Sequence, residues 1–552
     1  MPVVISLAVA VAMAVATPVA ANAHPLPTDD QPHQHHARPE KLGTIEFPVS
    51  CHAGSAVEFR RGLALLHSFW YDESEKAFAK AAAADPSCAM AHWGVAMANY
   101  HPIWAAPTPA ELETGRAAVA RARALEARTP REAAYIEAAS AFFADPASGD
   151  HGTRAAAYRQ AMERVHRDNP GDDEAAILYA LALLGTAPPT DRTYANQHKA
   201  GAILNAVLPR RKDHPGVAHY LIHSFDYPAL AHHALEAARS YSKIAESSPH
   251  ALHMPSHIFV RLGMWDDSIR SNILSAETAR AHRLKAEPGG SSFDELHAQD
   301  YLAYAYLQEG RDAEAKAILD KVRAVGRLDN ENFAAAYALA AVPARDALER
   351  RRWADAAALE VAPGAFPWAK FPFAEAITHF ARAVGAARSG DVVRARAASQ
   401  RLDALHKAIV DAKTPYWADP VEAQRRAAAA WLAFAEGRKE EALAAMRSAA
   451  ELEDVTDKHP VTPGAVLPAR ELLGDMLLEM GRPAEAVAEY AASLKVAPRR
   501  LYALLGAASA AHASGDRALA ETYYAQARDV TGDRPSARPE FVKLEASLAV
   551  KP

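Results

Sequence analysis

A repeat of about 34 residues is the feature that most limits how this chain can fold. Its clearest copy places Gly474, Ala486, Tyr490 and Pro498 at positions 8, 20, 24 and 32 of one unit. The same spacing recurs near the N-terminus in Gly62, Phe78, Ala81 and Pro86. Small residues let two helices approach closely, and proline ends the second helix. The repeat therefore predicts antiparallel helix pairs stacked along the chain.

The turn inside each predicted pair has its own signature, a glycine followed by polar residues. Glycine ends a helix in the left-handed conformation that other residues disfavour. Six such turns follow one another at Gly263, Gly310, Gly390, Gly437, Gly481 and Gly515. The spacing and the turns together resemble the tetratricopeptide (TPR) repeat. We expect an all-α, TPR-like α-solenoid of roughly ten helical hairpins.

The first residues have the pattern of a targeting segment. The stretch 3–19 is almost wholly apolar, and Ala21-Asn22-Ala23 is an A-x-A cleavage site. We expect a signal peptide over 1–23 with cleavage after Ala23, and hence a periplasmic or secreted protein. No later stretch approaches the roughly 18 apolar residues needed to cross a bilayer, so we expect no stable membrane span after cleavage.

Composition and breaker residues divide the remaining chain. Residues 24–56 are rich in His and Pro, which predicts a flexible leader. Residues 57–285 are expected to form an N-terminal TPR-like superhelix with a His-rich groove, and residues 286–552 a C-terminal one. Net charge is only −6, and no basic block interleaved with aromatics is present, so we expect no nucleic-acid partner.

The two cysteines, Cys51 and Cys88, are candidates for a disulfide in an oxidising compartment. In the chain-entropy model such a bridge stabilises the fold by about 3–4 kcal/mol. Two buried thiols or a redox-active pair are the alternatives.

Histidines are numerous, 25 in all, and four of them follow the repeat. His219 and His223 are four residues apart on one predicted helix, so both rings project from one face. His253 and His257 repeat this spacing 34 residues later. Neighbouring helices pack about 8–10 Å apart, so we expect the four imidazoles to converge on one point of the inner wall.

A cluster of imidazoles is the usual binding site for a first-row transition-metal ion such as Cu, Zn or Fe. In the following repeat, His297 and Asp300 fall on the same predicted face, where a carboxylate could join the ligands or orient a histidine. Two alternatives remain: a polar, peptide-binding groove without metal, and histidines inherited by duplication as packing residues.

Two further regions are secondary candidates for a site. His67 and His101 are also 34 residues apart, at position 13 of their units. A proline-rich stretch near the C-terminus contains His459, and Arg470 and Glu471 follow it closely. The alternative, which we favour, is a rigid connector with a capped helix start. No nucleotide-binding loop, serine-hydrolase elbow or H-E-x-x-H motif is present.

Three stretches are more specific than the general repeat pattern and resemble exported bacterial TPR-repeat proteins of unassigned function. They are residues 62–71 (GLALLHSFWY), 251–259 (ALHMPSHIF) and 461–475 (VTPGAVLPARELLGD). The resemblance covers most of the predicted mature chain. It implies the solenoid fold and a binding role for its groove, and it implies no reaction.

Two functions are consistent with these features. The first is a cell-envelope scaffold that holds a peptide or protein partner in its concave, His-lined groove, with or without a transition metal. The alternative is a metal-dependent enzyme, a hydrolase or an oxidoreductase, with a multi-His site in the groove.

Overall fold

The computed structural model describes residues 40–103, 106–125, 127–143, 149–286, 290–412, 415–532, 534 and 538–549. The predicted signal peptide (1–23) and the leader up to residue 39 lie outside the described residues. Lys41–Pro552 is one compact unit. Its described part consists of helices and loops with a single isolated bridge, between Ser291 and Leu328. The predicted all-α, TPR-like solenoid is confirmed.

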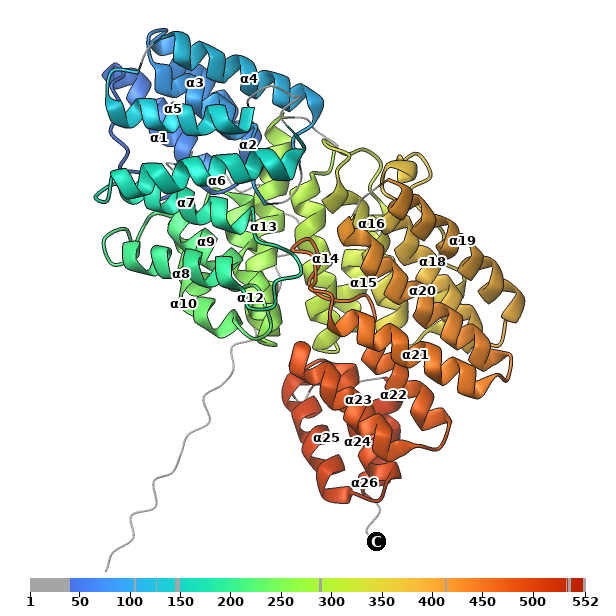
Figure 1. Cartoon of the computed structure of the whole chain (residues 1–552). Coiled ribbons are helices and arrows are strands. Elements are labelled where there is room, and N and C mark those ends of the chain that lie inside the picture. The colour runs from blue at the N-terminus through green and yellow to red at the C-terminus, as the bar shows by residue number, and fades with distance from the viewer. Residues whose placement is uncertain are drawn as a thin grey trace, which may run out of the picture. The chain divides into compact units, whose positions relative to one another are not determined.

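Helices follow one another as stacked pairs, each packed against its neighbours in the chain (Figure 1). The first part comprises α1 (Ala53–His67), α2 (Tyr71–Ala84), α3 (Ala89–Ala98), α4 (Pro109–Ala124), α5 (Pro130–Phe143), α6 (His151–Asp168), α7 (Asp173–Leu184), α8 (Ala195–Val207), α9 (Pro215–Phe225), the 3-10 helix η2 (Ala231–Ala234), α10 (Leu235–Ile244), α11 (Pro249–His253), α12 (Pro255–Arg261) and α13 (Trp265–Ala286).

The second part continues the same stacking. It comprises α14 (Phe293–Gln308), α15 (Asp312–Arg323), α16 (Phe333–Glu349), α17 (Trp353–Ala357), the 3-10 helix η3 (Trp368–Lys370), α18 (Pro372–Arg388), α19 (Val392–Asp411), α20 (Pro415–Ala435), α21 (Lys439–Asp454), α22 (Ala469–Glu479), α23 (Pro483–Val496), α24 (Leu501–Ala513), α25 (Arg517–Thr531) and α26 (Pro539–Ala549). None of the described helices is long and apolar enough to cross a membrane.

The small and large residues of the repeat pack as their spacing predicts. The buried ring of Phe78 on α2 lies between Gly62 on α1 and Gly94 on α3. A Cβ atom on Gly62 would come within 2.9 Å of that ring, and one on Gly94 would overlap it. Tyr490 on α23 lies in the same way between Gly474 and Gly506. Each large residue therefore fills the space left by glycines on two successive first helices.

The six predicted turn glycines all have left-handed backbones. Their φ angles are 66° at Gly263, 68° at Gly310, 83° at Gly390, 83° at Gly437, 72° at Gly481 and 87° at Gly515. A side chain in this region of φ is strained, which is why glycine occupies these turns.

Two clusters of buried apolar side chains form the core. One runs from Leu42 to Phe259 and the other from Val260 to Leu544, so they meet at α12. Leu42, Ile45 and Phe47, from the predicted leader, are buried in the first cluster. The predicted division at residues 285/286 stays a prediction.

Cys51 and Cys88 are joined by a disulfide. Cys51 precedes α1 and Cys88 is the N-cap residue of α3, so the bond ties two successive first helices together. The sequence left open a disulfide, two buried thiols or a redox-active pair, and the structure contains the disulfide.

A loop formed by residues 455–468, between α21 and α22, reaches the middle of the chain. The backbone oxygens of its Pro460 and Thr462 accept hydrogen bonds from Tyr301 on α14 at 3.1 and 3.2 Å. In Figure 1 this loop runs beside α14. We call it the 455–468 loop; it brings a C-terminal segment next to the histidines of α9–α14.

Candidate metal centre

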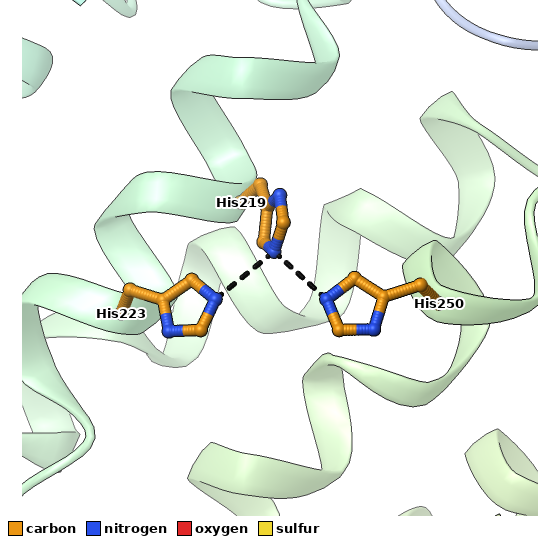
Figure 2. A group of neighbouring side chains, drawn as sticks. All are labelled: His219, His223 and His250. Atoms are coloured by element: carbon orange, nitrogen blue, oxygen red, sulfur yellow. Dashed lines mark hydrogen bonds between the residues drawn. The ribbon is translucent and has the colours of Figure 1, made fainter. Parts of the chain in front are cut away.

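Three imidazoles from two helices meet in the first triad, which consists of His219 and His223 on α9 and His250 on α11 (Figure 2). The Nε2 atom of His219 lies 3.1 Å from Nε2 of His223 and 3.2 Å from Nε2 of His250. Pro215 starts α9 and Pro249 starts α11, and neither needs an amide proton in a first turn. The three Nε2 atoms point toward one another.

The turn after α1 holds and covers this triad. The backbone oxygen of His67 lies 2.6 Å from Nδ1 of His219 and accepts a hydrogen bond from it. The ring of Phe69 packs against all three imidazoles, with centroids 4.4 Å from His219, 5.6 Å from His223 and 5.7 Å from His250. Phe69 has φ of 54°, a strained conformation of the kind that clusters at functional sites.

A second triad lies next to the first and consists of His253 on α11, His257 on α12 and His297 on α14. One ring nitrogen of each lies within 4.8 Å of the others. Pro255 interrupts the helix between His253 and His257, yet their Nε2 atoms lie 3.0 Å apart. Tyr301 packs on this triad, with its ring centroid 4.6 Å from that of His253.

Hydrogen bonds fix the tautomers of two rings of the second triad. Nδ1 of His257 lies 2.9 Å from a carboxylate oxygen of Asp226, which can only accept. Nδ1 of His253 lies 2.6 Å from Oδ1 of Asn272, whose amide nitrogen donates to Ser268 at 2.8 Å. Both Nδ1 atoms therefore donate. In the neutral rings both Nε2 atoms then carry lone pairs, which face each other at 3.0 Å.

This spacing suits a shared metal ion. A first-row ion binds imidazole nitrogen at roughly 2.0–2.1 Å, so two ligands at roughly 90–110° lie about 2.9–3.4 Å apart. The separations of 3.0, 3.1 and 3.2 Å fall within that range. A cation between the facing lone pairs would remove their repulsion, and the hydrogen bonds at Nδ1 are those that orient metal-binding histidines.

Burial keeps the six imidazoles neutral, which is the form that binds metal. None of the six side chains is more than 7% exposed. Burial is the largest cause that lowers the pKa of each ring, to about 3 for His219. The same cause lowers the pKa of the other five below the usual histidine value.

Asp226, just after α9, is the charged residue that supports the second triad. Its carboxylate accepts from His257, from Arg261 Nε at 2.9 Å and from Lys458 Nζ at 3.0 Å. Burial alone would raise the pKa of Asp226, but Lys458, Arg261 and His257 outweigh it and hold the pKa well below its usual range. Burial lowers the pKa of Lys458 to about 8. Asp226 thus joins the triad to the 455–468 loop.

The two triads are neighbours. His250 of the first and His253 of the second are three residues apart on α11, and their ring centroids are 6.2 Å apart. His223 of the first and His257 of the second are also 6.2 Å apart. Six histidines therefore form one continuous cluster near the junction of the two hydrophobic cores.

This arrangement differs from the single point of convergence that we expected for the two histidine pairs. Each pair stays together, but the pairs belong to different triads. His250, which the 34-residue spacing did not select, faces His219 in the place expected for His253. His219 thus faces a residue one helical turn before its equivalent in the next repeat, and a period in sequence does not fix which residues of two helices face each other.

His297 and Asp300, the residues predicted to complete the site, separate in the structure. His297 belongs to the second triad. Asp300 lies outside both triads and pairs with Arg345, whose Nε is 3.1 Å from its carboxylate. Burial raises the pKa of Asp300 to about 6. The carboxylate that orients a histidine is Asp226 instead.

The predicted pair His67 and His101 does not form a common site. His67 belongs to a third group with Glu174 and His214. The Nε2 atom of His67 lies 2.5 Å from one carboxylate oxygen of Glu174, and the Nε2 atom of His214 lies 3.1 Å from the other. These hydrogen bonds already use the atoms that would face an ion. His101 packs against Tyr71, with ring centroids 4.4 Å apart.

The secondary candidates near the C-terminus belong to neither triad. His459 is stacked on Trp417, with ring centroids 5.0 Å apart. Arg470 forms ion pairs with Asp454 and Glu489. Glu471 is buried beside Arg500.

A cavity of about 530 Å³ adjoins the cluster, and Arg261, Lys458 and Thr462 are part of its wall. Its other walls include the aromatic side chains of Tyr304, Tyr337, Tyr416 and Trp417. Arg261 and Lys458 contact Asp226, so one layer of side chains separates the cavity from His257.

Sequence reasoning missed four residues of this centre: His250, Asp226, Phe69 and Lys458. Two signals were available. His250 is three residues before His253, one helical turn away, and Phe69 lies in a stretch more specific than the repeat. Asp226 and Lys458 meet from positions 232 residues apart, and no local pattern predicts that contact.

No model of a known protein family and no curated protein matches the chain. Solved structures that match the chain include the TPR domain of P58(IPK), at 11% identity over 90% of this chain and 98% of that chain, with a TM-score of 0.21. Yeast Tom70 matches at 11% identity over 90% and 95%, with a TM-score of 0.32. The APC/C hetero-tetramer Cut9–Hcn1 matches at 12% over 89% and 96%, with a TM-score of 0.28.

These TM-scores are too low to carry a functional argument. The fold is defined by the structure itself: by its helix pairs, by the glycines packed on Phe78 and Tyr490, and by the turn glycines. The chain is an all-α solenoid of TPR-like helical hairpins.

Proposed function

We propose that this protein binds two first-row transition-metal ions, one in each histidine triad. One observation carries the proposal: the Nε2 atoms of His253 and His257 are 3.0 Å apart, while both Nδ1 atoms donate to acceptors. In the neutral rings these two Nε2 atoms share no proton, and a cation between them would bind both lone pairs. In the first triad, Nε2 of His219 likewise carries a lone pair, because its Nδ1 donates to His67, and it faces Nε2 of His223 and of His250.

The ligand set favours a reactive site over a closed structural one. Each triad offers three protein nitrogens, whereas structural sites usually have four protein ligands. A three-ligand site leaves a position open for a small molecule. This supports the metal-dependent enzyme over a scaffold whose metal is only structural.

The scaffold role stays a prediction. If the solenoid holds a peptide or protein partner, the cavity of about 530 Å³ beside the 455–468 loop is the place with suitable aromatic walls. Binding there would put a partner one residue layer from the second triad.

We place the protein in the bacterial cell envelope, either periplasmic or secreted. The A-x-A site after an apolar stretch, the resemblance to exported bacterial TPR-repeat proteins and the disulfide between Cys51 and Cys88 support this. Disulfides persist in oxidising compartments and are rare in the cytosol.

Elemental analysis of the full chain tests the metal proposal. Protein purified without chelators should contain close to two equivalents of transition metal. His219→Ala should lose the ion of the first triad and His257→Ala that of the second, so each retains about one equivalent. His512→Ala, an exposed histidine on α24, is the matched control and should retain both.

Circular dichroism separates loss of metal from loss of fold. If wild type holds no metal after incubation with Cu, Zn or Fe salts, or if His512→Ala loses as much as the triad variants, the proposal is wrong. If a triad variant is unfolded, the conservative His257→Gln replaces it, because the amide can still hydrogen bond but binds metal poorly.

A further inference from the structure

We propose that the two triads form one dinuclear copper centre that takes up dioxygen between its two ions. This inference rests on the proposed function and adds the identity of the metal, the coupling of the two sites and the ligand. It is carried by the closeness of the triads, by the charge of their surroundings and by their burial.

The two triads lie close together because they share one helix. α11 supplies His250 to the first triad and His253 to the second, and residues three apart on a helix lie side by side. The ring pairs His250–His253 and His223–His257 both have centroids 6.2 Å apart, so the triads adjoin along two edges. Two ions held at these Nε2 atoms are close enough to share a small bridging ligand.

Charge selects the ion. All six ligands are neutral imidazoles, and no carboxylate or thiolate belongs to either triad. The charge of Asp226 is already met by Arg261 and Lys458. Two divalent ions would bring four positive charges into this buried place, whereas two Cu(I) ions bring two. Because unpaired buried charge is costly, the site favours monovalent copper, which imidazole binds well.

Dioxygen can accept the two electrons that a pair of Cu(I) ions gives up on oxidation. Each Cu(I) gives one electron, so two Cu(II) ions form and O₂ becomes a two-electron-reduced dianion, with its O–O bond intact. The metals gain two positive charges and the bridging ligand carries two negative ones. The net charge of the buried centre therefore stays the same, and no proton or further reductant is required.

Burial fits a diatomic ligand. None of the six histidines is more than 7% exposed, and Phe69 and Tyr301 pack on the two triads. A small neutral molecule can diffuse to such a place, while a larger or charged substrate cannot. Any organic substrate would instead occupy the neighbouring cavity beyond Asp226.

The test loads the full chain with Cu(I) without oxygen, removes excess copper and then admits air-saturated buffer. His33, His35 and His36 are first replaced by alanine, because this histidine-rich stretch can bind copper nonspecifically. We expect two coppers per chain, a new near-ultraviolet absorption on adding dioxygen, and little electron paramagnetic resonance signal because the two Cu(II) spins are coupled.

His250→Ala supplies the matched comparison, since it removes a ligand of the first triad and leaves the second complete. It should hold about one copper, which gives a full-intensity Cu(II) signal after chemical oxidation. Two coppers that do not react with dioxygen, or that give the full signal of two isolated ions, would overturn this inference and leave the proposed function standing. No copper binding would overturn this inference, and the proposed function would fall with it only if zinc and iron also failed to bind.

Discussion

At the scale of single residues, the proposed metal centre depends on the hydrogen-bond acceptors that orient its imidazoles. The backbone oxygen of His67, the amide oxygen of Asn272 and the carboxylate of Asp226 each accept a hydrogen bond from Nδ1 of one triad histidine. Each leaves the Nε2 lone pair facing the neighbouring ring. Residues that never touch an ion therefore decide whether six histidines are ligands or ordinary core residues.

Asp226→Asn tests this dependence. The amide keeps the size of the side chain but removes the charge that pairs with Arg261 and Lys458 and that orients His257. We expect metal affinity at the second triad to fall about 10- to 100-fold, the range seen for outer-shell partners. Competition with a chromophoric chelator measures it. Asp168→Asn, with a 60% exposed side chain, is the control. Equal affinity in Asp226→Asn and wild type would contradict the role of Asp226.

Glu174 makes a prediction about acid stability. Burial alone would raise its pKa, but His67 and His214 outweigh burial and hold the pKa of Glu174 below its usual value. As pH falls, the unfolded chain therefore takes up this proton before the folded one, and stability decreases. Glu174→Gln should be less stable than wild type by about 1–3 kcal/mol at pH 7, and the difference should narrow below about pH 4.

Chemical denaturation at pH 7, 5 and 3.5 measures that difference. Glu137→Gln, with a 59% exposed side chain, should show almost none at any of the three values. A difference for Glu174→Gln that is constant down to pH 3.5 would show that the carboxylate charge does not stabilise this part of the fold.

At the scale of helices, close approach over glycine determines how successive pairs stack. Gly94→Ala would place a methyl group into the ring of Phe78, so we expect a loss of about 1–3 kcal/mol of unfolding free energy. Gly54→Ala on α1 is the matched control, because a Cβ there meets no atom within 4 Å. Alanine also favours a helix over glycine, so this control should be unchanged or slightly more stable. Thermal melts followed by circular dichroism distinguish the two, and equal melts would rule out the packing explanation.

The disulfide is a second device at this scale. Replacing both Cys51 and Cys88 by serine should lower the unfolding free energy by about 3–4 kcal/mol in the chain-entropy model. A reductant should lower the melting temperature of wild type toward that of the double variant and leave the variant unchanged. If reductant has no effect on wild type, the bond is absent from the protein as isolated.

Helices and turns were the part of the structure that the sequence predicted well. Their signals are local: a left-handed glycine at Gly263 or Gly481, and a large residue such as Phe78 at fixed distance from a small one. The histidine site was predicted in part, since both i, i+4 pairs lie in it. The division of the histidines into two triads was not predicted, because the packing of α11 on α9 brings His250, not His253, to His219. The contact of Lys458 with Asp226 was not predicted either, because the two residues are 232 positions apart.

At the scale of the whole unit, the proposed metal centre lies at the junction of the two hydrophobic cores. The two hydrophobic cores meet at α12, which carries His257. The 455–468 loop adds contacts from a distant repeat through Lys458, Pro460 and Thr462. In an ordinary solenoid each repeat contacts only its neighbours. The 455–468 loop therefore makes this part of the solenoid depend on non-neighbouring contacts as well.

The central claim is that each triad holds one ion through three imidazole nitrogens. Crystals of the copper-loaded protein, with anomalous diffraction recorded above and below the copper edge, test it most directly. We predict two anomalous peaks, one about 2.0–2.1 Å from nitrogens of His219, His223 and His250 and one at the same distance from those of His253, His257 and His297. Copper peaks found only elsewhere, with both triads empty, would contradict the account.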